Sequence, residues 1–390
     1  MTEYYLWLLQ VMGAANPRSL QLIRHFGSPE AVYAAFQKSP PRFLKPAESE
    51  ALKTASLDKS REILQTCAKY NYRAITLEDA EYPIALKNIY NPPIVLFAAG
   101  ELPKSELSIT VVGTREACDY SFKITQKLCY RLAKEGVVII SGMAIGIDKT
   151  AHSAALEAGR NSRDNCHGRT IGVLACGFAV DYPKFSTPFR QEIIEAGGAI
   201  VTELLPDSRG ERGYFNYRNR IMSGLSRGVI IIEAGEKSGC HITASHAINQ
   251  NRDLFCVPPA DIFHGRFKGV IGYLRDGAIP VFDHTDVLNE YFIKPVIEYN
   301  ASEDISAGDA VLCVPKNFNI IPEKPPEPTL SELSDDAAKI ADLLKDSPKT
   351  VDFLAEQSGL SADELSELLL ELEIDGVIES AAGSNYRLCL

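Results

Sequence analysis

The stretch VVIISGMAIGIDKTAHSAALEAG, residues 137–159, places an apolar strand, a glycine-containing turn and a helix in direct succession. The same alternation of strand and helix continues from about residue 71 to residue 300. Apolar strands that alternate with helices form parallel sheets covered on both faces. The sequence therefore predicts an α/β fold with an extended, Rossmann-like, doubly wound and mostly parallel sheet. The expected strands are 109–113, 137–141, 171–175, 199–203, 229–233 and 254–257.

Three further regions surround this 71–300 domain. Residues 1–67 predict short helices punctuated by Gly and Pro, including two joined at a glycine-containing turn, as in helix-hairpin-helix or SAM-like modules. Such a module either contacts a nucleic-acid backbone or only packs against the rest of the protein. Packing fits at least as well here, because few Lys or Arg lie near this turn. Residues 301–330 contain PEKPPEP and are an expected linker. Residues 331–390 show three helical segments and then two short strands, which is the winged-helix order.

Charge is distributed unevenly along the chain. The formal net charge is −11, and residues 331–390, with fourteen acidic and four basic residues, account for −10 of it. In contrast, residues 209–220 contain four arginines and one glutamate. The acidic total therefore does not exclude an anionic ligand.

The cysteines and the apolar residues indicate a cytoplasmic protein. The nine cysteines form no C-x-x-C pair and are odd in number, which is typical of reduced thiols. No apolar run is long enough for a membrane span, and the first ten residues lack the basic region of a signal peptide.

A ligand site is expected at the carboxyl ends of the strands, where doubly wound sheets bind their ligands. Small residues there let a ligand approach the backbone, and free N–H groups at the following helix starts favour phosphate. Arg115, Lys184, Arg218 and Arg220 add positive charge. No G-x-G-x-x-G loop follows the first strand, so a dinucleotide is not indicated. The small residues of this expected site are Gly113, Thr114, Ser141, Gly142, Ser238, Gly239 and Thr243.

The segment GYFNYRNRIMSGLS, residues 213–226, combines aromatic rings with guanidinium groups at the start of an expected helix. Phe215 and Tyr217 offer ring faces, and the neighbouring arginines offer partners for phosphates. This combination suits single-stranded nucleic acids, whose bases are free to stack. A structural role fits equally well, with both rings buried and Arg218 paired to an internal carboxylate such as Glu203 or Glu233. These residues alone leave both interpretations open.

Patterns typical of catalysis are missing. The Cys and His residues do not have the spacing of zinc ligands, and no G-x-S-x-G elbow occurs. Asp148, Glu203 and Glu233 follow strands, but they are dispersed among arginines, which favours an orienting role over a two-metal nuclease centre. We therefore expect no catalytic residue, no metal and no cofactor, and a protein that is not an enzyme.

Several long motifs resemble those of the DprA/Smf family of bacterial DNA-processing proteins. Their order and length make the resemblance specific, and it covers about residues 75–290. Many members also have a small helical N-terminal module and a C-terminal winged-helix-like domain. The motifs are VVGTR (111–115), SGMAIGIDKTAH (141–152), FNYRNRIMSGLS (215–226), EAGEKSGCHITA (233–244) and LRDGA (274–278).

The resemblance implies a protein that binds single-stranded DNA, protects it and loads the RecA recombinase on it during natural transformation and recombination. It also implies a homodimer. Carried over by position, the DNA pocket is lined by Arg115, Lys184, Phe215, Arg218, Asn219 and Arg220. Contacts to phosphate then come from Ser141, Gly142, Ser238, Gly239 and Thr243.

The sequence departs from the family pattern at several positions. Asn216 replaces a proline, and we expect its side chain to cap the N-terminus of the following helix. The asparagine of the family's Tyr-Pro-x-x-Asn pattern is missing after Tyr182-Pro183, and residues 160–167 are an insertion. These changes concern the details of the pocket more than the general function.

Two further expectations concern the C-terminal domain and a competing function. The segment 361–374, where a winged helix has its recognition helix, carries five acidic residues and no basic one, so duplex DNA would be repelled. We expect this domain to bind proteins or to pack. The competing function is a nucleotide or nucleoside-phosphate hydrolase on a Rossmann-like scaffold, although the P-G-G-x-G-T-x-x-E pattern of such enzymes is not found.

Overall fold

The computed structural model describes residues 1–36, 46–103, 106–162, 168–291, 335–345, 347 and 349–360, with shorter pieces up to residue 388. The chain divides into two compact units, Met1–Glu298 and Tyr299–Leu390. The linker expected at 301–330 and most of the insertion at 160–167 lie outside the described residues.

A sheet of nine described strands forms the centre of the first unit, in the order β1-β2-β6-β5-β4-β3-β7-β8-β9. The strands from β6 to β9 in this order are parallel, and β1 and β2 pair antiparallel at one edge. This confirms the predicted doubly wound, mostly parallel sheet and its six expected strands; β1, β2 and β9 were not expected. The bounds are β1 (Arg73–Thr76), β2 (Val95–Gly100), β3 (Ser108–Val112), β4 (Val138–Ser141), β5 (Thr170–Val173), β6 (Ala199–Thr202), β7 (Gly228–Ile231), β8 (Asp253–Cys256) and β9 (Ile279–Pro280).

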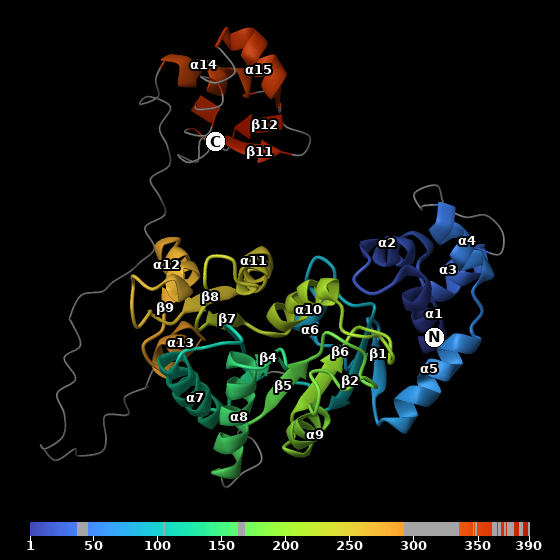
Figure 1. Cartoon of the computed structure of the whole chain (residues 1–390). Coiled ribbons are helices and arrows are strands. Elements are labelled where there is room, and N and C mark those ends of the chain that lie inside the picture. The colour runs from blue at the N-terminus through green and yellow to red at the C-terminus, as the bar shows by residue number, and fades with distance from the viewer. Residues whose placement is uncertain are drawn as a thin grey trace, which may run out of the picture. The chain divides into compact units, whose positions relative to one another are not determined.

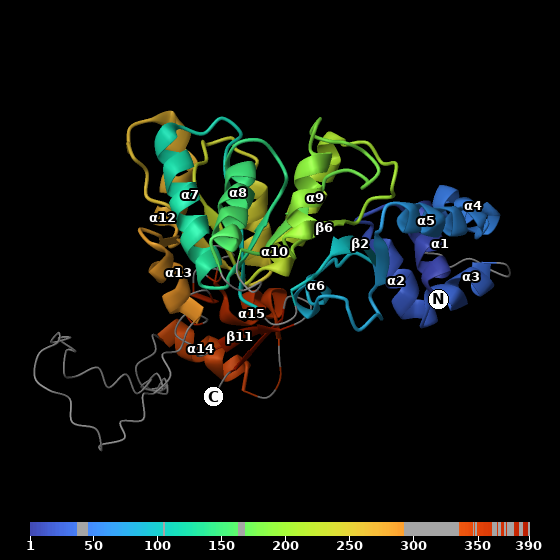
Figure 2. The same ribbon diagram turned by 90° about the horizontal axis from the view of Figure 1, so that it is seen from below.

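Helices cover both faces of this sheet (Figures 1 and 2). One face carries α7 (Asp119–Lys134), α8 (Ile147–Arg160) and α9 (Thr187–Glu195), and the other carries α10 (Arg212–Leu225), α11 (Cys240–Asn249) and α12 (Lys268–Arg275). Helix α13 (His284–Tyr291) packs against α7. The chain runs outward from β3 to β6 and then returns to β7 on the other side of β3. The direction of winding therefore changes between β3 and β7.

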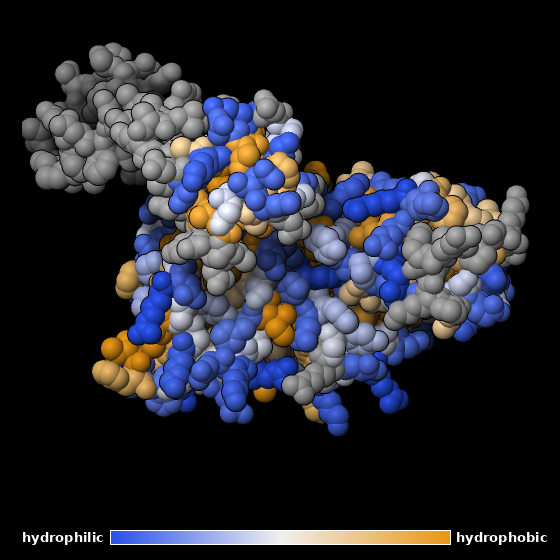
Figure 3. Space-filling view, turned by 90° about the horizontal axis from the view of Figure 1, so that it is seen from above, coloured by the Kyte–Doolittle hydropathy of each residue, from blue (hydrophilic) through white to orange (hydrophobic). Residues whose placement is uncertain are grey.

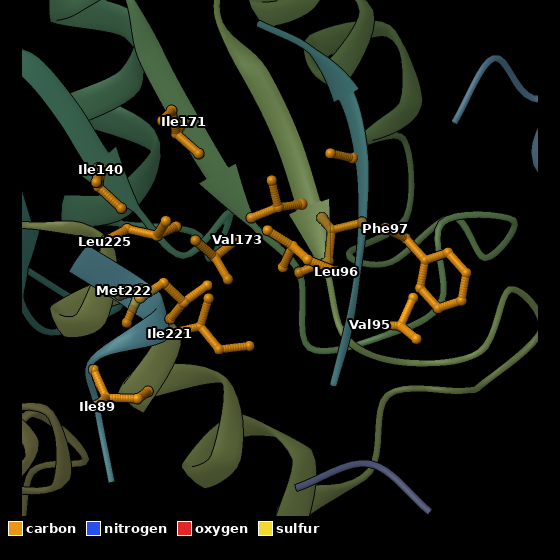
Figure 4. Packing of buried hydrophobic residues seen from close by; sticks show 14 of the residues in the cluster. Ile89, Val95, Leu96, Phe97, Ile140, Ile171, Val173, Ile221, Met222 and Leu225 are labelled. Atoms are coloured by element: carbon orange, nitrogen blue, oxygen red, sulfur yellow. The ribbon is translucent and has the colours of Figure 1, made fainter. Parts of the chain in front are cut away.

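Alternating side chains of the strands enter the two helical layers. In β4, Ile139 packs with the residues of α7 and α8, whereas Ile140 packs with those of α10. Figure 4 shows Met222 and Leu225 of α10 lying close to Ile140 and Val173 of the sheet. Because both faces are buried, consecutive residues of the central strands are apolar, as Ile139 and Ile140 are, rather than every second one.

The N-terminal helices share a hydrophobic core with the sheet. Their bounds are α1 (Thr2–Met12), α2 (Pro17–Phe26), α3 (Pro29–Phe36), α4 (Pro46–Thr54) and α5 (Asp58–Lys69). Trp7 is fully buried, and its indole N–H donates to the carbonyl of Ala55 at 3.1 Å. Gly27 ends α2 in the left-handed conformation, at φ 89°, where α3 soon follows. These described helices lie in the region where short helices were expected, and they belong to the same compact unit as the sheet.

The second unit contains α14 (Asp335–Leu343), α15 (Val351–Ser358) and a small antiparallel sheet. The sheet has the order β10-β12-β11, from β10 (Lys349–Thr350), β11 (Ile378–Ala381) and β12 (Asn385–Leu388). Leu354, Leu365 and Leu369 are buried in its core. Most of the acidic segment 361–374 lies outside the described residues.

The described surface in the view of Figure 3 is mostly hydrophilic, with apolar residues in small separate groups. None of the described helices has the length and the apolar character needed to cross a membrane.

Candidate nucleic-acid interface

A cavity of about 450 Å³ opens where β3 and β7 end. Its walls come from the segment after β3, from the start of α8, from α10 and from the start of α11. This is the point at which the winding of the sheet changes direction, and doubly wound sheets bind their ligands there. The expected site residues that line the cavity are Gly113, Thr114, Arg115, Phe215, Arg218, Asn219, Ser238, Gly239 and Thr243.

Arg115 and Phe215 form a pair at this cavity. The guanidinium carbon of Arg115 lies 5.4 Å from the centroid of the Phe215 ring, and the arginine is exposed. Both residues also border a smaller cavity of about 130 Å³, together with Ile145, Leu174 and Tyr182. A cation over a ring face is itself a favourable contact. The pair therefore offers a charged group and an aromatic ring at one place.

Arg218 is buried and connects the ends of two strands. Its Nη1 donates to the carbonyl oxygens of Gly142 and Val173, both at 2.6 Å. Gly142 has no space for a Cβ, because that atom would overlap the guanidinium group. Arg218 thus has a structural role while one side of it still lines the cavity. Gly142 itself borders the smaller cavity.

Asp148 is the buried acidic residue whose charge balances that of Arg218. Its carboxylate accepts the N–H of Ala144 at 3.3 Å, and the residue is buried at the first turn of α8. Burial raises the pKa of Asp148, and Arg218 opposes that rise. Burial likewise lowers the pKa of Arg218, and Asp148 opposes it. The two charges therefore stabilise each other at the edge of the cavity.

Arg220 and Ser141 are directed away from the cavity. Arg220 is buried, and its Nη2 lies 2.5 Å from the Oε2 of Glu203. Ser141 is also buried, and its hydroxyl donates to the carbonyl of Val111 at 2.7 Å. Glu203 thus pairs with Arg220 and not with Arg218. In this structure neither Arg220 nor Ser141 presents its polar group to the cavity.

The other two expected residues, Lys184 and Tyr217, are exposed outside the cavity. Tyr217 lies on α10 with 49% of its surface exposed, so it is not a core residue. Lys184 belongs to the turn that leads into α9. Both remain available for a ligand that extends beyond the cavity.

The start of α11 faces the cavity with small residues. Gly239 precedes the helix, and no described atom would lie within 4 Å of a Cβ placed there. The hydroxyl of Ser238 accepts the N–H of Cys240 at 3.3 Å. Burial raises the pKa of Cys240 to about 11, so its thiol stays protonated at neutral pH. The N–H groups and the dipole of this helix favour an anion.

Asn216 does not cap the helix, so that prediction was wrong. Helix α10 begins at Arg212, with Glu211 as its N-cap residue, and Asn216 lies in the second turn. A proline at 216 would disfavour the helical conformation at residue 215 and remove an N–H, whereas asparagine allows the helix to start earlier. Asn216 instead is exposed and lines the cavity, a position that the sequence analysis missed.

Glu233 holds the segment that carries Arg115. Its Oε2 accepts the N–H of Cys118 at 3.0 Å, and its Oε1 lies 3.6 Å from Arg266. The backbone of Thr114 also donates to the carbonyl of Glu233 at 3.0 Å.

Among the described residues, no three His, Cys, Asp or Glu side chains are grouped as a metal site would require.

The chain is similar in sequence to a family of DNA-processing proteins. Residues 73–292 match the family model of DNA recombination-mediator protein A, and residues 324–384 match that of the DprA winged helix domain. The chain is 31% identical to Protein Smf of Synechocystis over 343 residues, which is 84% of this chain and 82% of the relative. It is 34% identical to DNA processing protein DprA of Bacillus subtilis over 234 residues, which is 60% of this chain and 75% of the relative.

A solved structure shows the same similarity in three dimensions. The X-ray structure of DNA processing protein A from Streptococcus pneumoniae is similar to this chain with a TM-score of 0.63 and 30% sequence identity. The similarity covers 75% of this chain and 99% of that chain.

Proposed function

This chain belongs to the DprA/Smf family of DNA-processing proteins, and we propose that it binds single-stranded DNA at the cavity between the ends of β3 and β7. The observation that carries the proposal is the pair of Arg115 and Phe215, a cation and a ring exposed to the same cavity. Phosphates interact with the arginine and with the N–H groups at the start of α11. An unpaired base stacks on the ring.

Preference for a single strand follows from this arrangement. A stacked partner needs a base whose face is free, and the bases of a duplex already stack on each other. Side chains that read base edges in a groove are not required. Binding is therefore expected to tolerate many sequences and to weaken with salt, because phosphate contacts release counterions.

Within the cell, the proposed role is to protect incoming DNA and to load the RecA recombinase on it during natural transformation. Family membership supports this part of the proposal. We also propose that the protein acts as a homodimer, because two cavities on one strand raise the overall affinity without new contacts. Sedimentation of the purified protein tests the dimer. The RecA role is tested by RecA's ATP hydrolysis on DNA covered with single-strand-binding protein, which this chain should stimulate.

The direct test compares Arg115→Ala with wild type by fluorescence anisotropy, using labelled oligo-dT and a matched duplex over a range of salt. Lys127→Ala is the control, because Lys127 is exposed on α7, across the sheet from α10 and α11. We expect Arg115→Ala to lose about tenfold in affinity and to flatten the salt dependence by about 0.7 in log–log slope. Arg218→Ala is a poorer test, because it removes buried hydrogen bonds as well.

Two results would contradict the proposal. Equal affinity of wild type and Arg115→Ala for the single strand removes the cavity from the binding site. Release of phosphate from nucleotides by wild type, lost in Arg115→Ala, favours the competing hydrolase instead.

A further inference from the structure

Phe185 is an aromatic side chain in an unusual position. It is 86% exposed, and its backbone has a φ of 66°. Positive φ is rare for bulky residues, because Cβ crowds the backbone there. Exposed apolar area of this size is also unfavourable in water. A conformation with two unfavourable features requires a surrounding structure that enforces it.

Asp181 enforces this conformation. Its carboxylate accepts the N–H of Phe185 at 2.7 Å, the N–H and the hydroxyl of Thr187 at 3.0 and 2.8 Å, and the hydroxyl of Ser186 at 3.1 Å. The base of the turn is anchored as well, since the buried Arg190 donates to the carbonyl of Tyr182 at 2.7 Å. The turn therefore presents the Phe185 ring to solvent in a fixed conformation.

The same turn is joined to the candidate interface through Tyr182. The rings of Tyr182 and Phe215 are in edge contact, with centroids 5.9 Å apart. Tyr182, Phe215 and Arg115 together border the smaller cavity. Phe185 is three residues from Tyr182, so its Cα lies within about 11 Å of that of Tyr182. Lys184, next to it in the chain, is exposed and positively charged.

We propose that Phe185 is a second stacking platform, outside the cavities, for an unpaired nucleobase of the DNA strand bound at Arg115 and Phe215. Lys184 contacts the phosphate beside that base. The inference rests on the proposed function, because its occupant is a neighbouring part of the same strand. An exposed ring beside a cation is the combination that binds single strands without sequence preference.

A fluorescent reporter tests the stacking directly. The chain has one tryptophan, Trp7, which is fully buried in the N-terminal helices. Phe185→Trp therefore adds an exposed indole, and we expect oligo-dT to quench it while the duplex does not. The control is Phe282→Trp. Phe282 is 71% exposed, and its N–H also donates to an aspartate carboxylate, that of Asp286, at 2.7 Å. It follows β9, at the other edge of the sheet, so no quenching is expected there.

Affinity measurements distinguish the contribution of the Phe185 ring from that of the Lys184 charge. Phe185→Ala should weaken binding of oligo-dT at least about fivefold without changing the slope against salt, because it removes a stacking surface and no cation. Lys184→Ala should instead flatten that slope by about 0.7. Phe185→Tyr keeps an aromatic face and should retain most of the affinity, whereas Phe282→Ala should have no effect.

The outcomes distinguish the inference from the proposed function. If Arg115→Ala loses binding while Phe185→Ala binds like wild type and Phe185→Trp is not quenched, the second platform does not exist and the cavity site stands. If wild type does not bind single-stranded DNA, the proposed function fails and the inference fails with it. Circular dichroism of each variant establishes that it is folded.

Discussion

Arg218 and Gly142 fit together without spare room: the guanidinium Nη1 donates to the Gly142 carbonyl at 2.6 Å and occupies the space where a side chain at 142 would begin. The glycine thus allows an arginine of α10 to reach the ends of β4 and β5. The two residues are 76 positions apart in the chain. Their contact sets the distance between α10 and the sheet at one wall of the cavity.

Gly142→Ala is therefore expected to displace Arg218 and break its bonds to two carbonyl groups. The free energy of unfolding should fall by about 2–4 kcal/mol, since hydrogen bonds of charged groups contribute about 1.5–3 kcal/mol each. Affinity for oligo-dT should fall too, because the wall of the cavity moves. Urea denaturation and anisotropy measure the two effects. Gly239→Ala is the control for stability, since a Cβ at 239 meets no described atom within 4 Å.

Glu203→Gln tests the buried ion pair with Arg220. Both side chains are buried, and Arg220 has two further nitrogens without a hydrogen-bond partner among the described residues. Removing the charge of Glu203 leaves the arginine uncompensated, which costs about 3–5 kcal/mol of unfolding free energy. The folded fraction should still bind DNA with the salt dependence of wild type. The contrary result comes from a variant in which Arg220 itself is replaced. If the salt dependence of DNA binding is flatter for that variant, this arginine contacts phosphate.

His152 is expected to make the stability of the protein depend on pH. Its Nδ1 lies 2.7 Å from the Thr170 hydroxyl, which itself donates to the carbonyl of Ile139, so the histidine is the donor to Thr170. Its Nε2 is buried and has no hydrogen-bond partner among the described residues, and burial lowers the pKa of His152 from 6.5 to about 3.

The lowered pKa of His152 determines the direction in which stability changes with pH. The unfolded chain binds a proton below pH 6.5 and the folded chain only near pH 3, so stability falls as the pH falls between these values, by up to about 1.4 kcal/mol per unit. Urea denaturation from pH 7 to pH 4 should show a steeper loss for wild type than for His152→Asn. Parallel curves for the two proteins would contradict the prediction.

Asn216→Pro introduces the proline that the family resemblance implies at this position. Proline has no N–H for the bond to residue 212 and clashes with its carbonyl, so α10 should begin about one turn later. Hydrogen exchange should then be faster at residues 215, 217 and 218, whose N–H groups bond to the carbonyls of the N-cap residue and the first turn, and unchanged near Leu225. Asn216→Ala is the control, because alanine allows the early start of the helix. Equal protection in both variants would mean that the first turn does not depend on residue 216.

The strands illustrate what could be predicted from the sequence and what could not. The runs at 137–141 and 229–233 are apolar except at their last residue, so both a strand and its place inside a covered sheet were predicted. The edge strands β1 and β9 were missed, because their pairing depends on the neighbouring strand more than on their own residues. Strand β2 was also missed, although residues 94–99 are an apolar run. The shared core of the N-terminal helices and the sheet also depends on contacts between distant segments.

In the candidate site, too, some features could be predicted from the sequence and others depend on tertiary contacts. The sequence by itself determined the order of strands and helices. It therefore also determined that Arg115, Ser238 and the arginines of α10 lie on the side of the sheet where the carboxyl ends of the parallel strands meet. Only the tertiary structure decided which groups face the ligand. Arg218 and Arg220 are two residues apart on a helix of 3.6 residues per turn, so they point in widely different directions. The packing of α10 on the sheet places Arg218 at the cavity and Arg220 on Glu203, and that packing is set by contacts between residues far apart in the chain.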